Sequence, residues 1–315
     1  MTNDIFRTMA QTRDIKRRIK SVTNTKKVTR AMEMVSAAKM RKAVANVLAT
    51  RSYASLAWDL VKNLAARTDS QLHPLLKTRS PLKKIGLILI TSNRGLCGGF
   101  NSQIISQANR YIKHQKAEVD LEADLVIMGK KGQEAMFRAG QTIIAEFNKL
   151  DITTASKEIT PLSHLVINDY LSGRYDKVVI AYTDFVSTLA QKPRVMQLLP
   201  IINTGSDKDL GFAAPAALAG QPSEPEAAPN FEYIFEPTPR QVLDELLPRL
   251  IEMQIYQAIL ESDASEHSAR MIAMRNATDA ATEMISDLTL AFNKARQASI
   301  TAELADISGG RLAME

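Results

Sequence analysis

The segment MIAMRNATDAATEMISDLTLAFNKA, residues 271–295, has the residue spacing of a coiled-coil helix. One stripe recurs in it at alternating steps of three and four: Met271, Met274, Thr278, Ala281, Ile285, Leu288, Phe292 and Ala295. This is the heptad pattern of a left-handed coiled coil, in which one stripe of each helix faces a partner helix. The segment therefore predicts a helix that buries this stripe against another helix.

Glycine and proline are absent from long segments near both ends of the 315-residue chain. Neither occurs in residues 1–73 or in residues 249–308. Because these two residues are the strongest helix breakers, each segment is expected to form one uninterrupted helix. About 60 helical residues span roughly 90 Å, too long for a domain of this size to cover. The helices must therefore bury their stripes against each other, against a partner, or both.

The N-terminal helix has a less regular stripe, in which two groups of apolar residues are separated by the polar segment 23–27. The first group is Ile15, Ile19 and Val22, and the second is Val28, Ala31, Val35 and Ala38. We expect the contact face to change phase between the two groups.

The middle of the chain alternates strand and helix patterns. Apolar runs such as IGLILIT (85–91) and KVVIAYTDF (177–185) indicate buried strands, with amphipathic segments and glycine-containing turns between them. This alternation is typical of an α/β layered domain with a mostly parallel sheet.

The same patterns set the expected domain boundaries. We place an N-terminal coiled-coil helix at 1–73, a central α/β domain at 74–237 and a C-terminal coiled-coil helix at 238–315. Within the central domain, residues 204–230 combine four prolines with small and polar residues, which predicts a mobile surface loop.

Composition restricts the class of protein. With 45% hydrophobic and 23% charged residues, the chain has the composition of a soluble globular protein. No apolar run approaches the ~18 residues that a membrane span needs, so any membrane association is expected to be peripheral. The N-terminus lacks the apolar segment of a signal peptide, so the chain is expected to begin in the cytosol as written. Cys97 is the only cysteine, which excludes an internal disulfide.

The positive charge is concentrated at one end. Residues 1–51 hold thirteen Lys and Arg against three acidic residues, while the net charge of the whole chain is +6. Such a segment suggests an acidic partner, which nucleic acid, an anionic membrane or an acidic protein surface would all satisfy. A merely solvated helix face is the simpler alternative.

Sequence motifs for catalysis or ligand binding are missing. The glycine-rich run Arg94-Gly95-Leu96-Cys97-Gly98-Gly99 matches neither G-x-x-x-x-G-K-[ST] nor G-x-G-x-x-G, so we interpret it as a tight turn that needs positive φ. The four histidines share no metal-ligand spacing, and no H-E-x-x-H or G-x-S-x-G is present. We expect no catalytic site, no metal and no cofactor.

Four stretches of the sequence are distinctive: NTKKVTRAMEMVSAAKMRK (24–42), SNRGLCGGFN (92–101), SEHSARMIAMRNATDAA (265–281) and LTLAFNKARQASITAEL (288–304). They resemble the gamma-subunit family of F-type ATP synthases, in its bacterial type. Unrelated coiled coils would share heptads with this chain, but not these four strings in this order. The resemblance extends over almost the whole chain and implies an α/β fold with a long antiparallel coiled coil of N- and C-terminal helices plus a central Rossmann-like domain.

The resemblance also implies a function and partners. It implies the non-catalytic central shaft of a proton-translocating ATP synthase, present in one copy per complex and inserted through a ring of alpha and beta subunits. The α/β domain would contact the epsilon subunit and the membrane c-ring, on the cytoplasmic face of the bacterial inner membrane. Catalysis would belong to the beta subunits, and nucleic acid would not be a partner.

By motif match, the resemblance assigns roles to seven residues. Those implied to contact the beta subunits are Met32, Arg296, Gln297 and Thr301. The residue implied to align the two shaft helices is Arg270, and those implied to lie at the foot near the c-ring or epsilon are Tyr233 and Glu236.

Two other classes of protein stay open at this point. A coiled-coil protein that binds nucleic acid would show salt-sensitive DNA binding, and an α/β enzyme with helical extensions would bind a nucleotide in its middle domain. Copurification with alpha and beta subunits would favour the rotor.

Overall fold

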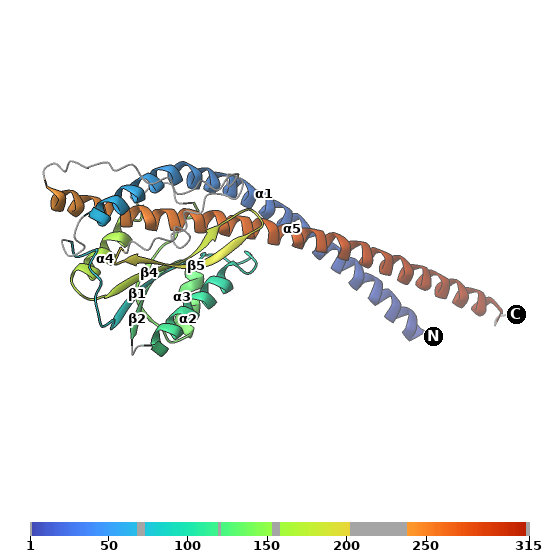
Figure 1. Cartoon of the computed structure of the whole chain (residues 1–315). Helices are drawn as coiled ribbons and strands as arrows, with labels where there is room; N and C mark the ends of the chain where they lie inside the picture. Colours follow the sequence, from blue (N-terminus) through green and yellow to red (C-terminus); the bar gives the residue numbers. More distant parts are fainter. Residues whose placement is uncertain (1, 68–72, 119–120, 153–157, 202–237, 313–315) are drawn as a thin grey trace. The chain divides into compact units, whose positions relative to one another are not determined.

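The described residues form two long helices, three shorter helices and a five-stranded sheet (Figure 1). The computed structural model describes residues 2–67, 73–118, 121–152, 158–201 and 238–312. The elements are α1 (Thr2–Arg67), β1 (Lys84–Ile90), α2 (Phe100–Glu118), β2 (Glu122–Met128), α3 (Lys130–Arg138), β3 (Thr142–Phe147), α4 (Thr160–Leu171), β4 (Lys177–Phe185), β5 (Gln191–Leu199) and α5 (Pro239–Leu312). The expected loop at 204–230 lies outside the described residues.

The described chain forms two compact units, and α1 and α5 contribute to both. The coil unit contains α1 up to Ser36 and α5 from Met271 onward. The body unit runs from Ala37 to Arg270 and contains the whole sheet. The domain boundaries expected from sequence, at residues 73/74 and 237/238, divide the chain differently from these two units, and they stay a prediction.

The sheet of the body unit has the strand order β3-β2-β1-β4-β5. β1 pairs in parallel with β2 and β4, and β2 pairs in parallel with β3. Only β5 is antiparallel to its neighbour, β4. The sheet is therefore mostly parallel, as its continuous apolar strands predict.

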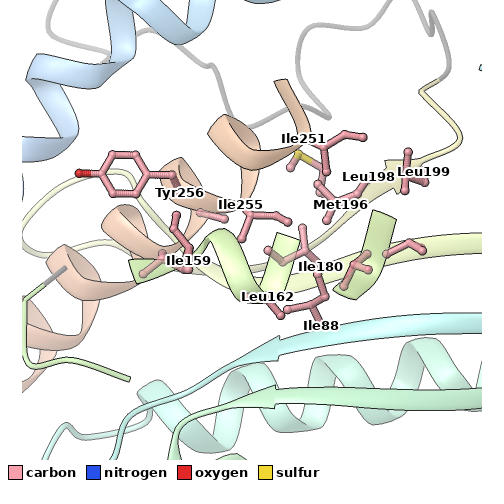
Figure 2. Close-up of a cluster of buried hydrophobic side chains, with 14 of the residues drawn as sticks. Ile88, Ile159, Leu162, Ile180, Met196, Leu198, Leu199, Ile251, Ile255 and Tyr256 are labelled. Carbon is pink, nitrogen blue, oxygen red and sulfur yellow. The ribbon is translucent and has the colours of Figure 1, made fainter. Parts of the chain in front are cut away.

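Helices cover both faces of this sheet. Alternate residues of a strand point to opposite faces, so Leu87 and Leu89 of β1 pack in a cluster with residues of α2 and α3. Ile88 belongs to the other cluster, which includes residues of α4 and α5. Figure 2 shows part of that second cluster, where Ile251 and Ile255 of α5 lie over the sheet. Helix α5 is thus part of the core of the body unit.

In the coil unit, α1 and α5 pair in an antiparallel direction. The hydroxyl oxygens of Thr29 and Thr278 lie 2.8 Å apart, and Glu33 pairs with Arg275 at 3.2 Å, so rising numbers in α1 meet falling numbers in α5. The stripe predicted on α5 is confirmed, because every one of its residues is buried or half-buried. The antiparallel coiled coil implied by the resemblance is also confirmed.

The phase shift expected in α1 is wrong. Its less exposed residues include one unbroken heptad series, Ile15, Ile19, Val22, Lys26, Thr29, Glu33 and Ser36. Thr29, Glu33 and Ser36 are buried, whereas Val28 and Val35 are 58% and 55% exposed. Because the buried positions are polar and the exposed ones apolar, hydrophobicity alone selected the wrong face.

Candidate functional site

A network of buried charges joins α5 to the loop after β3 in the body unit. Lys149, in that loop, places its ammonium 2.9 Å from Asp263 Oδ1 and also donates a hydrogen bond to Glu266 Oε2. The side chains of Lys149 and Asp263 are only 2% and 1% exposed. Burial opposes the charge of Lys149, yet the two carboxylates outweigh it and raise the pKa of Lys149. The lysine is therefore held in its charged form.

Arg270 extends the network by one turn of α5. Its guanidinium lies 2.9 Å from Glu266 Oε1, so this carboxylate has a cation on each oxygen. Burial favours the neutral acid, but Lys149 and Arg270 hold the pKa of Glu266 below its ordinary value. Arg270 also donates hydrogen bonds to the carbonyls of Arg94, at 3.2 Å, and Gly95, at 3.4 Å. These contacts attach α5 to the glycine-rich loop.

A third connection runs through His267 and Asp151. His267 Nε2 lies 2.7 Å from the carbonyl oxygen of Asp151 and donates to it. The carboxylate of Asp151 accepts a hydrogen bond from Lys39 of α1 at 2.7 Å, which lowers the pKa of Asp151. Burial lowers the pKa of His267, which keeps its ring neutral at pH 7.

The glycine-rich loop is a turn closed by its own side chains. Asn101 Oδ1 accepts from the backbone N–H of Ser92 at 3.0 Å, and Asn101 Nδ2 donates to the Ser92 hydroxyl at 2.7 Å. Positive φ occurs at Gly98 (57°) and also at Leu96 (64°). The turn interpretation is therefore confirmed at Gly98, while Gly95 and Gly99 have no positive φ to account for them.

The residues implied to contact beta subunits lie on the coil unit. Met32 is half-buried on α1, and Arg296, Gln297 and Thr301 are exposed on α5. Their roles stay predictions. Tyr233 and Glu236 lie outside the described residues. Arg270 contacts Glu266 and the glycine-rich loop, and its role in helix alignment also stays a prediction.

Sequence reasoning missed the anchor of the network, Lys149. It is a single lysine in a loop, without periodicity or motif. The signal lay in its partners: the α5 segment ESDASEHS, residues 261–268, places charged or polar groups on every side of the helix, and all eight residues are buried. A buried helix with no apolar face needs counter-charges from another element.

A groove between α2 and α3 is a second polar feature of the body unit. It encloses about 810 Å³ and is lined partly by cations, Arg110, Lys113, Lys131 and Arg138. Lys131 is paired with Glu134 at 2.8 Å. The groove therefore presents a net positive surface.

The described part of the chain contains no group of His, Cys, Asp and Glu side chains arranged to hold a metal ion. Within that same part, no helix combines the length and the hydropathy that a membrane crossing requires.

Fold and network together define a class of protein. It is an α/β body in which one helix, α5, is fixed by buried ion pairs and continues along the chain into a two-helix coil. Its most elaborate polar structure holds an element of the fold in position.

Comparison with known proteins identifies the family. The chain matches the ATP synthase family over residues 11–314. The ATP synthase gamma chain of Dehalococcoides mccartyi is 46% identical over 308 residues, covering 97% of this chain and 100% of the relative. That of Herpetosiphon aurantiacus is 44% identical over 313 residues, covering 97% and 99%. The chain therefore belongs to the ATP synthase gamma chain family.

Solved structures share the fold. A chain in the rotational state 3 structure of the Euglena gracilis mitochondrial ATP synthase has a TM-score of 0.66 at 20% identity, covering 97% of this chain and 95% of that one. A chain in the central stalk and c-ring structure of the Tetrahymena thermophila mitochondrial ATP synthase has a TM-score of 0.59 at 23% identity, covering 79% and 99%. At these identities the likeness concerns the fold alone.

Proposed function

We propose that this chain is the non-catalytic central rotor shaft of a proton-translocating F-type ATP synthase. It couples rotation of the membrane c-ring to ATP synthesis or hydrolysis in the beta subunits. The supporting observation is the outward apolar row on α1, where Val28, Met34 and Val35 are more than half exposed although the helix already has a partner along its seam. Exposed apolar groups on a paired helix suit a surface that other chains enclose.

The coupling follows from symmetry and linkage. One shaft with two unlike helices, placed in a threefold ring, presents a different face to each catalytic subunit. Each face stabilises a different state of its subunit, so turning the shaft changes the nucleotide affinities in sequence. By reciprocity, nucleotide binding changes the preferred angle of the shaft.

Four side chains of the coil unit are proposed to contact the beta subunits. Met32 lies beside the basic stretch of α1, and Arg296, Gln297 and Thr301 lie near the end of α5. Gln297 and Thr301 are one turn apart, and the Thr301 hydroxyl donates to the Gln297 carbonyl at 2.9 Å. Exposed donors and acceptors suit contacts that form and break at every step of rotation.

Further partners are proposed for the remaining residues. Tyr233 and Glu236 would contact the c-ring or the epsilon subunit, and Arg270 would keep the shaft helices aligned. The basic segment 1–51 would face acidic parts of the beta subunits, since no aromatic side chain that could stack on a base lies between Arg7 and Arg51. One copy per complex would bind peripherally at the cytoplasmic face of the bacterial plasma membrane.

Met32→Lys tests the function. The substitution adds a positive charge where the shaft is proposed to pass the beta subunits, so like-charge repulsion within the basic stretch should weaken coupling while assembly persists. In membranes that carry the mutant complex, ATP-driven proton pumping should fall at least threefold more than ATP hydrolysis. Met32→Leu, which adds no charge, is the control and should keep both. Equal losses in pumping and hydrolysis, or no change in either, would contradict the assignment.

A further inference from the structure

The body unit holds α5 by apolar contacts, by hydrogen bonds to loop carbonyls and by buried ion pairs, and the first and the last of these differ in their mechanical properties. The apolar contacts include Ile251 and Ile255 against the cluster on one face of the sheet (Figure 2). Such contacts are strong in sum but non-directional, because they depend on the area removed from water. Close packing of these side chains also resists displacement, but it is spread over many contacts and no single pair of atoms dominates it.

The ionic contacts are directional. Lys149 reaches α5 from the loop after β3, more than a hundred residues away in sequence, and bridges Asp263 and Glu266, which are three positions apart on the helix. All three side chains are at least nine-tenths buried. An ion pair in such surroundings is barely screened by solvent, so its energy changes steeply with the separation of the charges. A small displacement of α5 relative to this loop would therefore be opposed.

The positions of the two cations show which ion pair joins α5 to another element of the body unit. Arg270 is on the same helix as Glu266, four positions on, so this ion pair moves with α5, and Arg270 reaches another element only through its hydrogen bonds to the carbonyls of Arg94 and Gly95. Lys149 is on another element, and its ammonium is the cation that joins the two carboxylates of α5 to the sheet side of the body.

We propose that Lys149 is a positioning residue for torque transfer, through which load passes between the sheet of the body unit and helix α5. This inference rests on the proposed rotor function, since a chain that does not turn carries no torque. The bridge prevents α5 from slipping under load, so that the angle of the body unit and the angle of this helix stay equal.

The test uses the whole ATP synthase with the double variant Lys149→Met and Asp263→Asn. This variant removes one cation and one anion together, so the buried charges stay balanced and Glu266 keeps Arg270 as its partner. Assembly should therefore persist, measured as the amount of complex in the membrane. The ratio of proton pumping to ATP hydrolysis should fall at least threefold, and it should fall further when pumping works against a larger proton gradient. The single variant Lys149→Arg retains the charge, so its ratio of proton pumping to ATP hydrolysis should be at least half that of the unmodified complex.

The matched control removes an ion pair of the same kind from the surface. Lys131→Met with Glu134→Gln eliminates an exposed pair on α3, and the pumping-to-hydrolysis ratio should not change. An unchanged ratio in the Lys149 double variant would overturn the inference, as would equal losses of both activities or a failure to assemble, because these results assign Lys149 a folding role only. If the unmodified chain itself gives no complex that pumps protons, the rotor function fails instead.

Discussion

Replacing Glu33 by leucine should stabilise the coil unit. Glu33 occupies a heptad position of α1 that is only 5% exposed, and its carboxylate pairs with Arg30 at 2.9 Å and Arg275 at 3.2 Å. Both arginine side chains are more than half exposed, at 55% and 63%. The carboxylate is therefore largely removed from water, while its partners remain solvated.

The expected magnitude follows from these exposures. A leucine buried at this position contributes about 1.5–3 kcal/mol. Losing two ion pairs with exposed arginines costs about 0.2–1 kcal/mol each. Glutamate and leucine have similar helix propensities, so the backbone contributes little. The net change for Glu33→Leu is a stabilisation of about 1 kcal/mol, in line with the behaviour of other buried ion pairs replaced by apolar groups.

A second variant, which removes the two arginines and keeps Glu33, gives the sharper comparison. Arg30→Met with Arg275→Met leaves Glu33 buried without its two cations, which should destabilise the coil by about 3 kcal/mol. Urea unfolding of the full chain, followed by far-ultraviolet circular dichroism, measures both changes, and Glu283→Leu on the exposed face of α5 is the control, with a change of about 0.5 kcal/mol or less. A destabilisation by Glu33→Leu as large as that of the double arginine variant would refute the reasoning.

Two further outcomes are expected for the full chain. The pKa values of His267 and Glu266 are lowered in the folded chain, so the unfolded chain binds more protons. The thermal midpoint should therefore fall as the pH drops below about 6.5, and again below about 4.3. His267→Gln should reduce the first fall, and an unchanged profile would contradict the buried neutral state of His267. Gly98→Ala should cost about 1–2 kcal/mol because φ is 57° there. Gly99→Ala should cost less in the same urea titration, since the three atoms nearest to its added carbon all belong to the flexible side chain of Gln103.

Most of the fold could be predicted because apolar patterns mark it. The heptads of residues 271–295 gave the face of α5, and the apolar runs gave a mostly parallel sheet. The face of α1 could not be predicted, because Thr29 and Glu33 occupy its seam while Val28 points outward. A hydrophobic pattern locates a contact only where the contact is apolar.

The buried network of Lys149, Asp263 and Glu266 could not be predicted from the sequence, for a related reason. Lys149 has no partner near it in sequence, and its carboxylates belong to a segment of α5, residues 261–268, that is polar on all sides. Such a segment predicts either a solvated helix or a buried ionic site, and only the fold decides between them. Arg270 was found through the resemblance alone, without the contacts that it makes.

The polar groups buried in both units raise the same question, because apolar side chains would hold these helices at least as firmly. In the coil, a polar residue at a heptad position costs stability but restricts the register of the two helices. In the body, the bridge from Lys149 to Asp263 and Glu266 restricts the position of α5 in the same way. If Glu33→Leu stabilises the coil, and the charge-balanced variant of Lys149 assembles but couples poorly, then neither site is needed for folding. Both would then serve to fix where α5 lies, which a shaft under load requires.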